Sequence, residues 1–528
     1  MWSPKGKNTF MQGAAILTMA AIFVKILSAV YRVPFQNIVG DIGFYIYQQV
    51  YPFYGIAIAL STYGFPVIVS KLIAESMNDP QRRQEVISLS YYITSCTGVL
   101  LWAAVFFGSE IIAAVMGDRS LQTLLQITSF SFLFIPFLTV WRGVFQGEGN
   151  MMPTAVSQIV EQSVRVGAIL LFSYVLIKKG ASLYTAGAGA LAGSIAGALA
   201  AVAVLFYFVR KGSLISKGKR RVKSSVTRKE IQVLFIQGAA ICLSSMGMIL
   251  FQLVDSLNVY QGLIKGGMGE LEAKIAKGVY DRGQPLLQLG TTAAVALALT
   301  LVPLVTSAYR RNLYRELDNC IQLALKVSVT FGLAATAGLL NIMDMVNMML
   351  FENSNGSFVL SVFCTSILFS SLVLTLTGIL QGLGNDFFPA VAVLTGVVFK
   401  YIGNIMLIPL FGTFGAAAAT VLSFSWMTAF LAFLLQKKWK TAFLKKEAAG
   451  KALLAAFCMT IVLQAWRWSI EYVLSSEANS RLAMTGIALS SVAVGAFVFI
   501  YIILKVKLFT EEELQQIPFG SRLSRRTK

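Results

Sequence analysis

The sequence predicts an all-helical polytopic membrane protein with about fourteen transmembrane helices, on the strength of three observations. Of its 528 residues 56% are hydrophobic and only 13% are charged, whereas soluble domains hold about 45–50% apolar and about 25% charged residues. The mean hydropathy is +0.71. Apolar runs of about 18–25 residues, each long enough to cross a bilayer, recur along the whole chain. These properties exclude a soluble enzyme, a disordered chain and a secreted disulfide scaffold.

The first apolar run follows Lys5 and Lys7 and is too long for the core of a signal peptide. No A-x-A-type cleavage site follows it, so we interpret it as an uncleaved membrane anchor. The predicted spans, in chain order, are 10–33, 43–69, 86–108, 121–145, 154–177, 184–209, 231–256, 283–308, 319–341, 357–380, 389–410, 413–436, 449–470 and 482–505.

Basic residues between the spans predict the orientation of the chain. With the N-terminus inside, the cytoplasmic segments hold 29 Lys and Arg and the outer segments hold 10. This excess follows the positive-inside rule and predicts that both termini are cytoplasmic. The net charge of +20 has the same origin, and the absence of a basic stripe interleaved with aromatic residues argues against a nucleic-acid partner. The basic stretch 217–229 either only marks this topology or also binds anionic membrane lipids.

Three short motifs recur at similar offsets and indicate an internal repeat. The offsets are 235, 225 and 237 residues, and the matches occur in the same order along the chain. The paired motifs are QGEGN (146–150) with QGLGN (381–385), QGAAI (12–16) with QGAAI (237–241), and PVIVS (66–70) with PLVTS (303–307).

The repeat predicts two six-helix lobes of the same topology. We expect an N-lobe at 1–209, a basic cytoplasmic linker at 210–229, a C-lobe at 230–447, and two last helices with a basic cytoplasmic tail at 448–528. Two parallel six-helix repeats are typical of transporters whose substrate site lies between the halves near the midplane. Prolines within or at the ends of spans either free backbone carbonyls for a cavity or only kink the helices. They are Pro52, Pro66, Pro136, Pro285 and Pro303.

Charges inside the membrane are expensive and usually face a cavity or a partner. Lys25 lies deep in the first span, and Arg32 follows seven residues later with Ser28 between them. This spacing predicts a cationic stripe that runs to the outer surface. The alternative for Arg32 is snorkelling to the headgroups.

Span 5 contains Glu161 and Arg165 at i,i+4, an order that favours an ion pair within the helix. The two residues are therefore either a self-neutralised structural pair or part of the cavity. The repeat offset of 235 places Lys400 at the position that matches Arg165, on a face shared with Asn404. We expect a cation at matching depth in both lobes, unless an acid elsewhere neutralises Lys400.

Polar residues also gather near the outer ends of spans 7 and 8. Asp255 and Asn258 end span 7, and Asp281 and Arg282 open span 8, which continues to Gln288. We expect these side chains to line the cavity or to take part in coupling.

Two further cations lie near cytoplasmic ends of spans. We expect Lys326 to snorkel to the headgroups and Arg142 to serve only as a topology signal.

The candidate cavity thus holds more Lys and Arg than Asp and Glu, which suits an anionic substrate such as a diphosphate. The segment 211–220 lacks the spacing of a phosphate-binding loop, so the energy source is an ion gradient, the membrane potential or the substrate gradient. Histidine is absent and the five cysteines are widely spaced. We therefore expect no metal site, no cofactor and no enzymatic activity.

Four stretches carry a family resemblance: 141–165 (WRGVFQGEGNMMPTAVSQIVEQSVR), 25–54, 64–75 and 407–420. They resemble the group that includes stage V sporulation protein B, the YabM-type proteins and the MurJ-like flippases of Gram-positive bacteria. The resemblance covers essentially the whole chain and implies the MOP exporter superfamily, with two six-helix lobes forming a V and two final helices. It also implies flipping of a polyprenyl-diphosphate-linked saccharide, such as lipid II or a related envelope precursor, across the bacterial cytoplasmic membrane.

In MurJ-like flippases, arginines of helices 1 and 8 line the cavity. By resemblance, Lys25 and Arg32 lie where the helix 1 cations would be, and Arg282 matches the helix 8 pattern. The cavity arginine of helix 2 has no counterpart, because residues 51–65 carry no charge. Some of these proteins bind sodium through helices 7 and 11, where this chain has Lys400. We hypothesise that its ammonium takes the place of the ion, while the last two helices line a groove for the lipid tail by resemblance.

Two alternatives remain open, and the second belongs to another functional class. A cation-coupled drug antiporter of the same superfamily would need a lone cavity carboxylate, and Asp255 and Glu161 are the candidates. A non-transporting scaffold for envelope or sporulation enzymes would tolerate loss of the buried cations. We expect the chain to act as a monomer.

Overall fold

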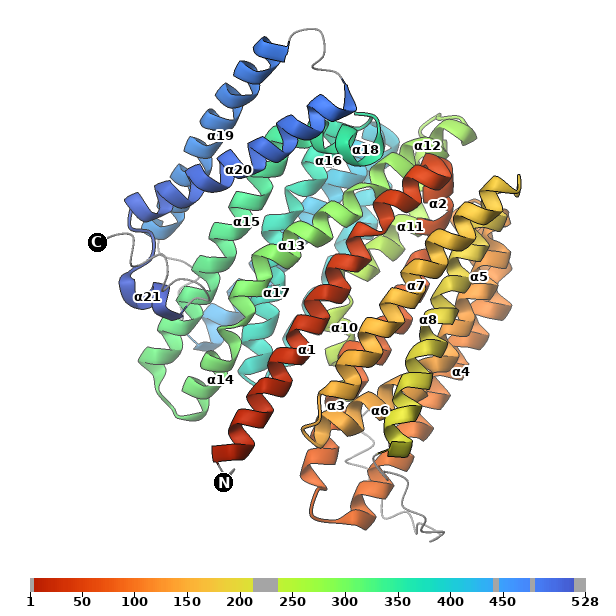
Figure 1. Cartoon of the computed structure of the whole chain (residues 1–528), viewed down its shortest axis with the longest axis vertical. Helices are drawn as coiled ribbons and strands as arrows, with labels where there is room; N and C mark the ends of the chain where they lie inside the picture. The colour runs from red at the N-terminus through yellow and green to blue at the C-terminus, as the bar shows by residue number, and fades with distance from the viewer. Residues whose placement is uncertain (1–3, 212–235, 440–445, 475–479, 517–528) are drawn as a thin grey trace. The chain divides into compact units, whose positions relative to one another are not determined.

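The computed structural model describes residues 4–211, 236–439, 446–474 and 480–516. All regular secondary structure in these ranges is helical (Figure 1), as the sequence predicts. Most of the predicted linker and the basic tail from 517 lie outside the described residues. The helices pack into two compact units, Met1–Gly278 and Val279–Lys528, which we call unit 1 and unit 2.

The helices up to the linker all belong to unit 1. They are α1 (Pro4–Val30), α2 (Arg32–Ala59), the π-helical turn η1 (Leu60–Gly64), α3 (Phe65–Glu75), α4 (Pro80–Met116), η2 (Arg119–Leu121), α5 (Gln122–Ser129), η3 (Phe130–Phe134), α6 (Ile135–Gly147), α7 (Met152–Lys178) and α8 (Leu183–Lys211).

The helices after the linker begin in unit 1 and continue through unit 2. They are α10 (Gly238–Ser245), α11 (Gly247–Lys265), α12 (Glu270–Asp281), α13 (Gly283–Leu299), α14 (Val302–Arg310), α15 (Tyr314–Phe351), α16 (Ser357–Cys364), α17 (Ser366–Gly382), α18 (Phe387–Trp439), α19 (Lys446–Leu474), α20 (Arg481–Lys505) and α21 (Glu511–Gln516).

Ten helical segments within the described ranges are long and apolar enough to cross a membrane, or eleven if the bent pair α10–α11 counts as one span. Two of them are too long for one crossing. The run Ile16–Glu75 has 60 residues and α18 has 53, which at 1.5 Å per residue is about 90 and 80 Å against a hydrocarbon core of about 30 Å. Each therefore corresponds to two predicted spans.

The backbone breaks where the predicted spans meet. Gly40 has φ +69° and Gly412 has φ +58°, a region that glycine adopts without steric cost. Predicted spans 7 and 8 are each split as well, into α10 and α11 at an angle of 66° and into α13 and α14. Every predicted span thus has a helical counterpart within the described residues, although only ten or eleven helical segments there are long and apolar enough to cross a membrane.

Local sequence signals account for the helix ends. At the start of α4, Asp79 accepts hydrogen bonds from the backbone N–H groups of Gln81 and Arg82 at 3.0 Å each, and Pro80 occupies the first turn. At its end, Gly117 adopts a left-handed conformation with φ +83°. Both are the residue types that helix termini favour.

The predicted prolines differ in their positions. Pro66, Pro136 and Pro303 occupy the first turn of α3, α6 and α14, where a missing N–H costs nothing. Of the five, Pro52 lies in the interior of α2, while Pro285 is the third residue of α13. Most of these prolines therefore lie at the starts of helices, a position that neither of the two predicted roles had considered.

Small residues bring α8 against α7 in unit 1. A Cβ added at Gly197 would lie 2.6 Å from the carbonyl oxygen of Glu161 and 2.9 Å from Cβ of Arg165. A Cβ at Gly193 would lie 2.9 Å from the backbone nitrogen of Ile169. Close approach through glycine is typical of helix contacts in membranes. This contact fixes the segment of α7 that holds two of the predicted site residues.

The helix pair α10–α11 packs within unit 1, although the repeat assigns it to the C-lobe. Nε2 of Gln49 donates to the carbonyl oxygen of Ser256 at 3.1 Å, and the Ser256 hydroxyl donates to the carbonyl oxygen of Gln48 at 3.4 Å. The limit between unit 1 and unit 2 follows from which residues contact one another, whereas the lobes were predicted from a sequence repeat. The two divisions need not coincide, and the lobe limits stay a prediction.

In unit 2, polar contacts join α15 to α19 and to the C-terminal segment. Nε2 of Gln464 donates to Oδ1 of Asn341 at 2.7 Å. The expectation that Lys326 snorkels is wrong, because its Nζ lies 2.7 Å from Oε2 of Glu513 and 5.0 Å from the centre of the Phe509 ring. The partner of Lys326 is thus an acid of α21, which lies far along the chain.

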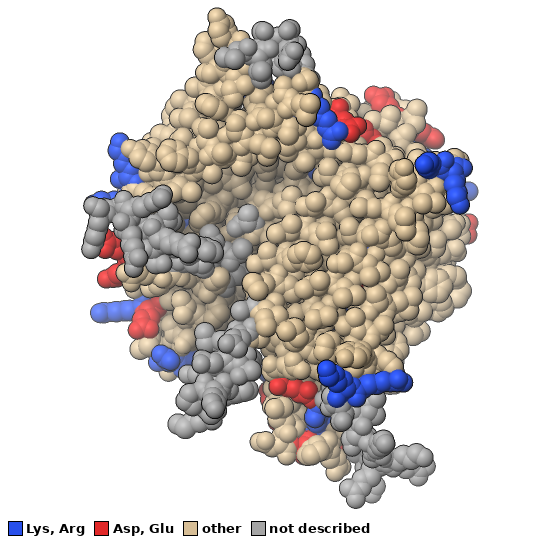
Figure 2. All heavy atoms as spheres, viewed as in Figure 1, with Lys and Arg blue, Asp and Glu red and all other residues tan. Residues whose placement is uncertain are grey.

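The surface of unit 1 has an apolar middle. Leu100, Phe107 and Ile111 of α4 are about 70% exposed, as expected of side chains that face lipid. On the face shown in Figure 2, the charged side chains of this unit lie near the ends of its helices.

Candidate functional site

Arg165 on α7 is completely buried, and all three of its guanidinium nitrogens lack a hydrogen-bond partner among the described residues. Its neighbours are aromatic. The guanidinium carbon lies 5.2 Å from the centre of the Tyr31 ring and 4.8 Å from the centre of the Tyr54 ring. Cation–π contacts of this kind stabilise a buried guanidinium only partly, because they leave its N–H donors without acceptors.

Arg32 lies in the same environment. It is the first residue of α2 and is 1% exposed, and its guanidinium carbon lies 4.5 Å from the centre of the Tyr51 ring. Its Nε and Nη1 have no hydrogen-bond partner within the described ranges. The prediction that Arg32 extends a stripe to the outer surface, or snorkels there, is therefore wrong. The tyrosines cover it.

Four tyrosines form what we call the tyrosine cage: Tyr31, Tyr47, Tyr51 and Tyr54. The hydroxyls of Tyr31 and Tyr47 are hydrogen-bonded at 2.8 Å, and the rings of Tyr51 and Tyr54 pack edge to face at 6.2 Å. The hydroxyl of Tyr54 is buried and has no partner among the described residues. The cage therefore holds one more donor without an acceptor, in addition to the two arginines.

The spacing of three cage tyrosines could have been found in the sequence. Tyr47, Tyr51 and Tyr54 are separated by four and three residues, so they share one face of α2. They were not predicted, because tyrosines in an apolar span carry no charge and are not unusual there. Tyr31, between α1 and α2, joins them only through the fold.

Glu161 does not pair with Arg165, although the i,i+4 spacing suggested it. Its Oε2 lies 2.5 Å from Nη2 of Arg142 on α6. The interpretation of Arg142 as a topology signal is also wrong, since Arg142 is completely buried. The i,i+4 spacing brings two residues into reach, but the packing of α6 on α7 decides which cation the carboxylate meets.

Arg142 is held by further acceptors. Its Nε donates to Oγ of Ser157 at 3.1 Å, and its Nη1 donates to Oγ1 of Thr62 at 3.1 Å and to the carbonyl oxygen of Ser61 at 3.4 Å. Ser61 and Thr62 belong to η1, and π-helical turns of this kind are frequent at functional sites.

The charges around the cage do not balance. Arg32, Arg142 and Arg165 are each at most 1% exposed. Glu161, which is 7% exposed, forms an ion pair with Arg142. A buried charge without a partner costs several kcal/mol. An anion bound at Arg32 and Arg165 would supply both the missing charge and the missing acceptors.

The other predicted residues of unit 1 are placed as follows. Lys25 on α1 is half-buried and Ser28 is buried, and neither side chain forms a hydrogen bond with the cage among the described residues. Asp255 on α11 is buried and Asn258 is half-buried, and both have polar or electrostatic partners.

In unit 2, Arg282 is completely buried just before α13. Its Nη1 donates to Oδ1 of Asn347 at 3.1 Å and to Oδ1 of Asn353 at 2.8 Å, and Nδ2 of Asn347 donates to the carbonyl oxygen of Asn355 at 2.8 Å. These bonds tie the start of α13 to the end of α15 and the loop that follows. Asp281 beside it is buried, and Gln288 on α13 is half-buried.

Lys400 is completely buried within α18. Its Nζ donates to the carbonyl oxygen of Ala416 at 2.9 Å and to Oγ1 of Thr420 at 2.6 Å. The Thr420 hydroxyl also lies 3.2 Å from the hydroxyl of Tyr280. Asn404, one turn further along α18, is buried as well. The ammonium thus joins the two halves of this helix on either side of Gly412.

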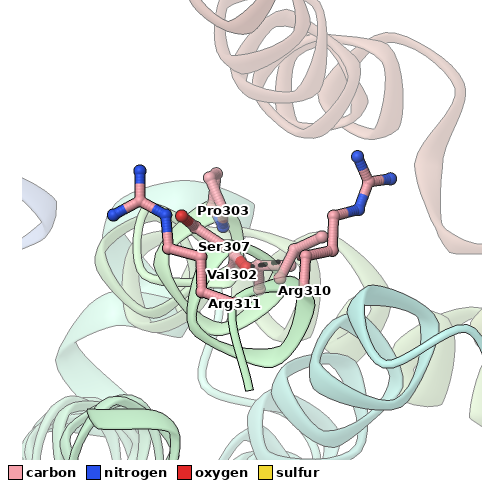
Figure 3. A pocket seen from close by; sticks show the side chains of 6 residues that line it. Val302, Pro303, Ser307, Arg310 and Arg311 are labelled. Carbon is pink, nitrogen blue, oxygen red and sulfur yellow. Dashed lines mark hydrogen bonds between the residues drawn. The ribbon is translucent and has the colours of Figure 1, made fainter. Parts of the chain in front are cut away.

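A hollow of about 490 Å³ lies on α14, between Val302, Pro303, Thr306, Ser307, Arg310 and Arg311. Figure 3 shows that the side chains of Arg310 and Arg311 point away from each other. Two guanidinium groups that diverge cannot hold one small anion together, and none of the predicted site residues lines this hollow.

Comparison with known proteins places these observations in a family context. A family model described as polysaccharide biosynthesis protein matches residues 10–309. The chain is 44% identical over 525 residues to the uncharacterized membrane protein YabM of Bacillus subtilis (strain 168), across 98% of this chain and 97% of that protein. The lipid II flippase MurJ and stage V sporulation protein B of the same organism are 24% and 25% identical, over 94% and 98% of this chain and 95% and 99% of theirs.

Solved structures agree at the level of the fold. A lipid II flippase MurJ in an inward closed conformation superposes with a TM-score of 0.68 at 15% identity, covering 92% of this chain and 98% of that one. An inward-facing multidrug resistance MATE family transporter of the MOP superfamily gives 0.65 at 14% identity, over 81% and 98%. Both the predicted fold class and the resemblance drawn from sequence motifs are confirmed.

Proposed function

The chain belongs to the polysaccharide biosynthesis protein family, and from this premise we propose that it flips a polyprenyl-diphosphate-linked saccharide across the cytoplasmic membrane by alternating access. It is a multi-pass membrane transporter of the MOP superfamily, related to the lipid II flippase MurJ, and not an enzyme. The carried saccharide would be a lipid II-like peptidoglycan precursor or a related envelope intermediate. Both termini would face the cytoplasm.

The observation that supports the proposal most is Arg165, a buried guanidinium with neither a carboxylate nor a hydrogen-bond acceptor in the described ranges. A diphosphate offers several charged oxygens, and guanidinium groups bind such oxygens through short, charge-assisted hydrogen bonds. Arg32 and the Tyr54 hydroxyl add further donors in the same cage. One anion of this kind would satisfy all of them.

The remaining predicted cations have subsidiary roles in this proposal. Lys25, half-buried on α1, would contact the substrate on its path, and Arg282 and Lys400 would contribute positive potential from unit 2. Arg282 and Lys400 already donate to neutral oxygens of their own unit, so they are weaker candidates for direct contact. The coupling ion, if there is one, would act elsewhere than at Arg165.

The two alternatives fit the cage less well. A drug antiporter would carry a cation, and two uncompensated arginines would repel it. Its candidate carboxylate Glu161 is already paired with Arg142. A scaffold without transport would have no use for a buried charge that costs several kcal/mol.

Reconstituted flipping tests the proposal. Purified protein in proteoliposomes would receive a fluorescent polyprenyl-diphosphate saccharide, and exposure of the label in the outer leaflet would be followed with and without a membrane potential. We expect Arg165→Met to lower the flipping rate about a hundredfold, since a lost contact between close charges costs about 1.5–7 kcal/mol. Arg481→Met, which removes an exposed cation paired with Glu352, should leave the rate unchanged.

A substrate control separates the diphosphate from the lipid. The matching polyprenyl-monophosphate saccharide, with fewer charged oxygens, should be flipped more slowly by the wild type but lose less with Arg165→Met. Failure of the folded wild type to flip either lipid would contradict the proposal. Equal rates for the wild type and Arg165→Met would show that the tyrosine cage does not bind the diphosphate.

A further inference from the structure

Glu161 stands between two arginines. It precedes Arg165 by one helical turn on α7, a spacing that places Cβ atoms about 5–6 Å apart and allows an ion pair. Its carboxylate instead lies 2.5 Å from Nη2 of Arg142. Whichever arginine holds this carboxylate determines whether the other is available to a ligand.

The guanidinium of Arg142 is anchored independently of Glu161. Ser157 on α7 and both Ser61 and Thr62 of η1 accept three further hydrogen bonds from it, at 3.1–3.4 Å. A group fixed by bonds to two elements cannot follow a moving carboxylate, so it sets the place where the carboxylate rests. The Arg165 guanidinium, by contrast, lies over the rings of Tyr31 and Tyr54, and its nitrogens have no hydrogen-bond partner among the described residues.

We propose that Arg142 is a positioning residue that holds Glu161 away from Arg165 and so keeps the Arg165 guanidinium free for the anionic group of the substrate. This inference rests on the proposed function, because it explains how the cage stays cationic with a carboxylate one turn away. Arg142 itself does not touch the substrate. It acts by neutralising the one acid that could occupy Arg165 from the same helix.

The competing explanation is that Arg142 only fastens α6 to α7 and η1. Both explanations predict harm from Arg142→Met, so the single variant does not separate them. The double variant Arg142→Met with Glu161→Gln does. If Arg142→Met weakens binding because Glu161 then pairs with Arg165, removing the charge of Glu161 restores binding. If Arg142→Met weakens binding because α6 no longer packs on α7 and η1, the second substitution does not restore it.

The measurement is binding of farnesyl diphosphate to the purified full-length protein in detergent, by titration calorimetry. We expect Arg142→Met to weaken binding at least tenfold, equivalent to 1.4 kcal/mol, because the released carboxylate pairs with Arg165. The double variant should bind within about threefold of the wild type, a difference of about 0.7 kcal/mol. In the flipping assay the same pattern should appear in the half-saturating substrate concentration rather than in the maximal rate.

Two controls make the outcomes distinct. Arg467→Met, alone and with Asp344→Asn, removes a partly exposed ion pair of unit 2 and should leave binding unchanged in both forms. Arg142→Lys keeps a cation beside Glu161 but loses most of the bonds to η1, so it should bind almost normally even if it unfolds more easily. This variant keeps the test decisive if Arg142→Met does not fold.

Each result has one meaning. No binding of farnesyl diphosphate by the folded wild type would overturn the proposed function. Normal binding by Arg142→Met, or equally weak binding by the single and double variants, would overturn the positioning role while leaving the proposed function intact.

Discussion

The buried cations of unit 1 and unit 2 are equally shielded but differ in what holds them. Arg165 has no hydrogen-bond acceptor among the described residues and rests between aromatic rings. Arg282 and Lys400 each donate to two neutral oxygens of unit 2. Burial alone therefore does not mark a cation as a ligand contact. A buried cation whose donors all have acceptors within the protein supports the fold. A buried cation whose donors lack acceptors is the better candidate for contact with a ligand.

Arg165→Met should separate stability from transport most clearly. Replacing an uncompensated buried charge by an apolar side chain of similar size should raise the free energy of unfolding by about 1–4 kcal/mol, while flipping falls. Denaturant unfolding of the purified protein in detergent measures the first quantity. A loss of stability would mean that Arg165 has an internal partner and that the contrast with unit 2 does not hold.

Arg282→Met should have the opposite effect on stability. It leaves Oδ1 of Asn347 without its donor, whereas Oδ1 of Asn353 keeps the backbone N–H of Asn355 at 3.1 Å. One unsatisfied buried group costs about 1–3 kcal/mol, so we expect the free energy of unfolding to fall by about that amount. The same unfolding experiment detects it, and an unchanged midpoint would show that the asparagines find other partners.

Lys400→Ala tests whether the ammonium takes the place of an ion. It exposes the carbonyl oxygen of Ala416 and the hydroxyl of Thr420 inside α18, oxygens of the kind that coordinate cations. We expect a stability loss of about 1–2 kcal/mol and flipping that becomes stimulated by sodium. Transport unchanged in rate and in sodium dependence would end the hypothesis.

Arg467→Met gives the smallest expected change. Its ion pair with Asp344 is about one-third exposed on both sides, and partly solvated pairs contribute about 0–1 kcal/mol. Thermal unfolding should move by no more than a few degrees. A larger shift would indicate that the contacts between α15 and α19 are as important as those around Arg282.

The site illustrates how far local patterns reach. The apolar runs predicted the helices, and the rarity of charges in them singled out Arg165, Arg282 and Lys400. The pairing of Glu161 was mispredicted because the i,i+4 rule considers one helix only. The role of Arg142 was missed for the same reason, since its acceptors Ser61 and Thr62 lie about 80 residues away.

The sequence by itself determined that this chain crosses the membrane many times, is helical throughout the described ranges, and buries more cations than carboxylates. Those properties follow from composition and local spacing, which do not depend on which helices become neighbours. Only the tertiary structure decided that Arg142 takes Glu161, that tyrosines enclose Arg165, and that asparagines hold Arg282. Each of these depends on contacts between helices distant in sequence, where packing brings groups within about 3 Å of one another and a local pattern holds no information.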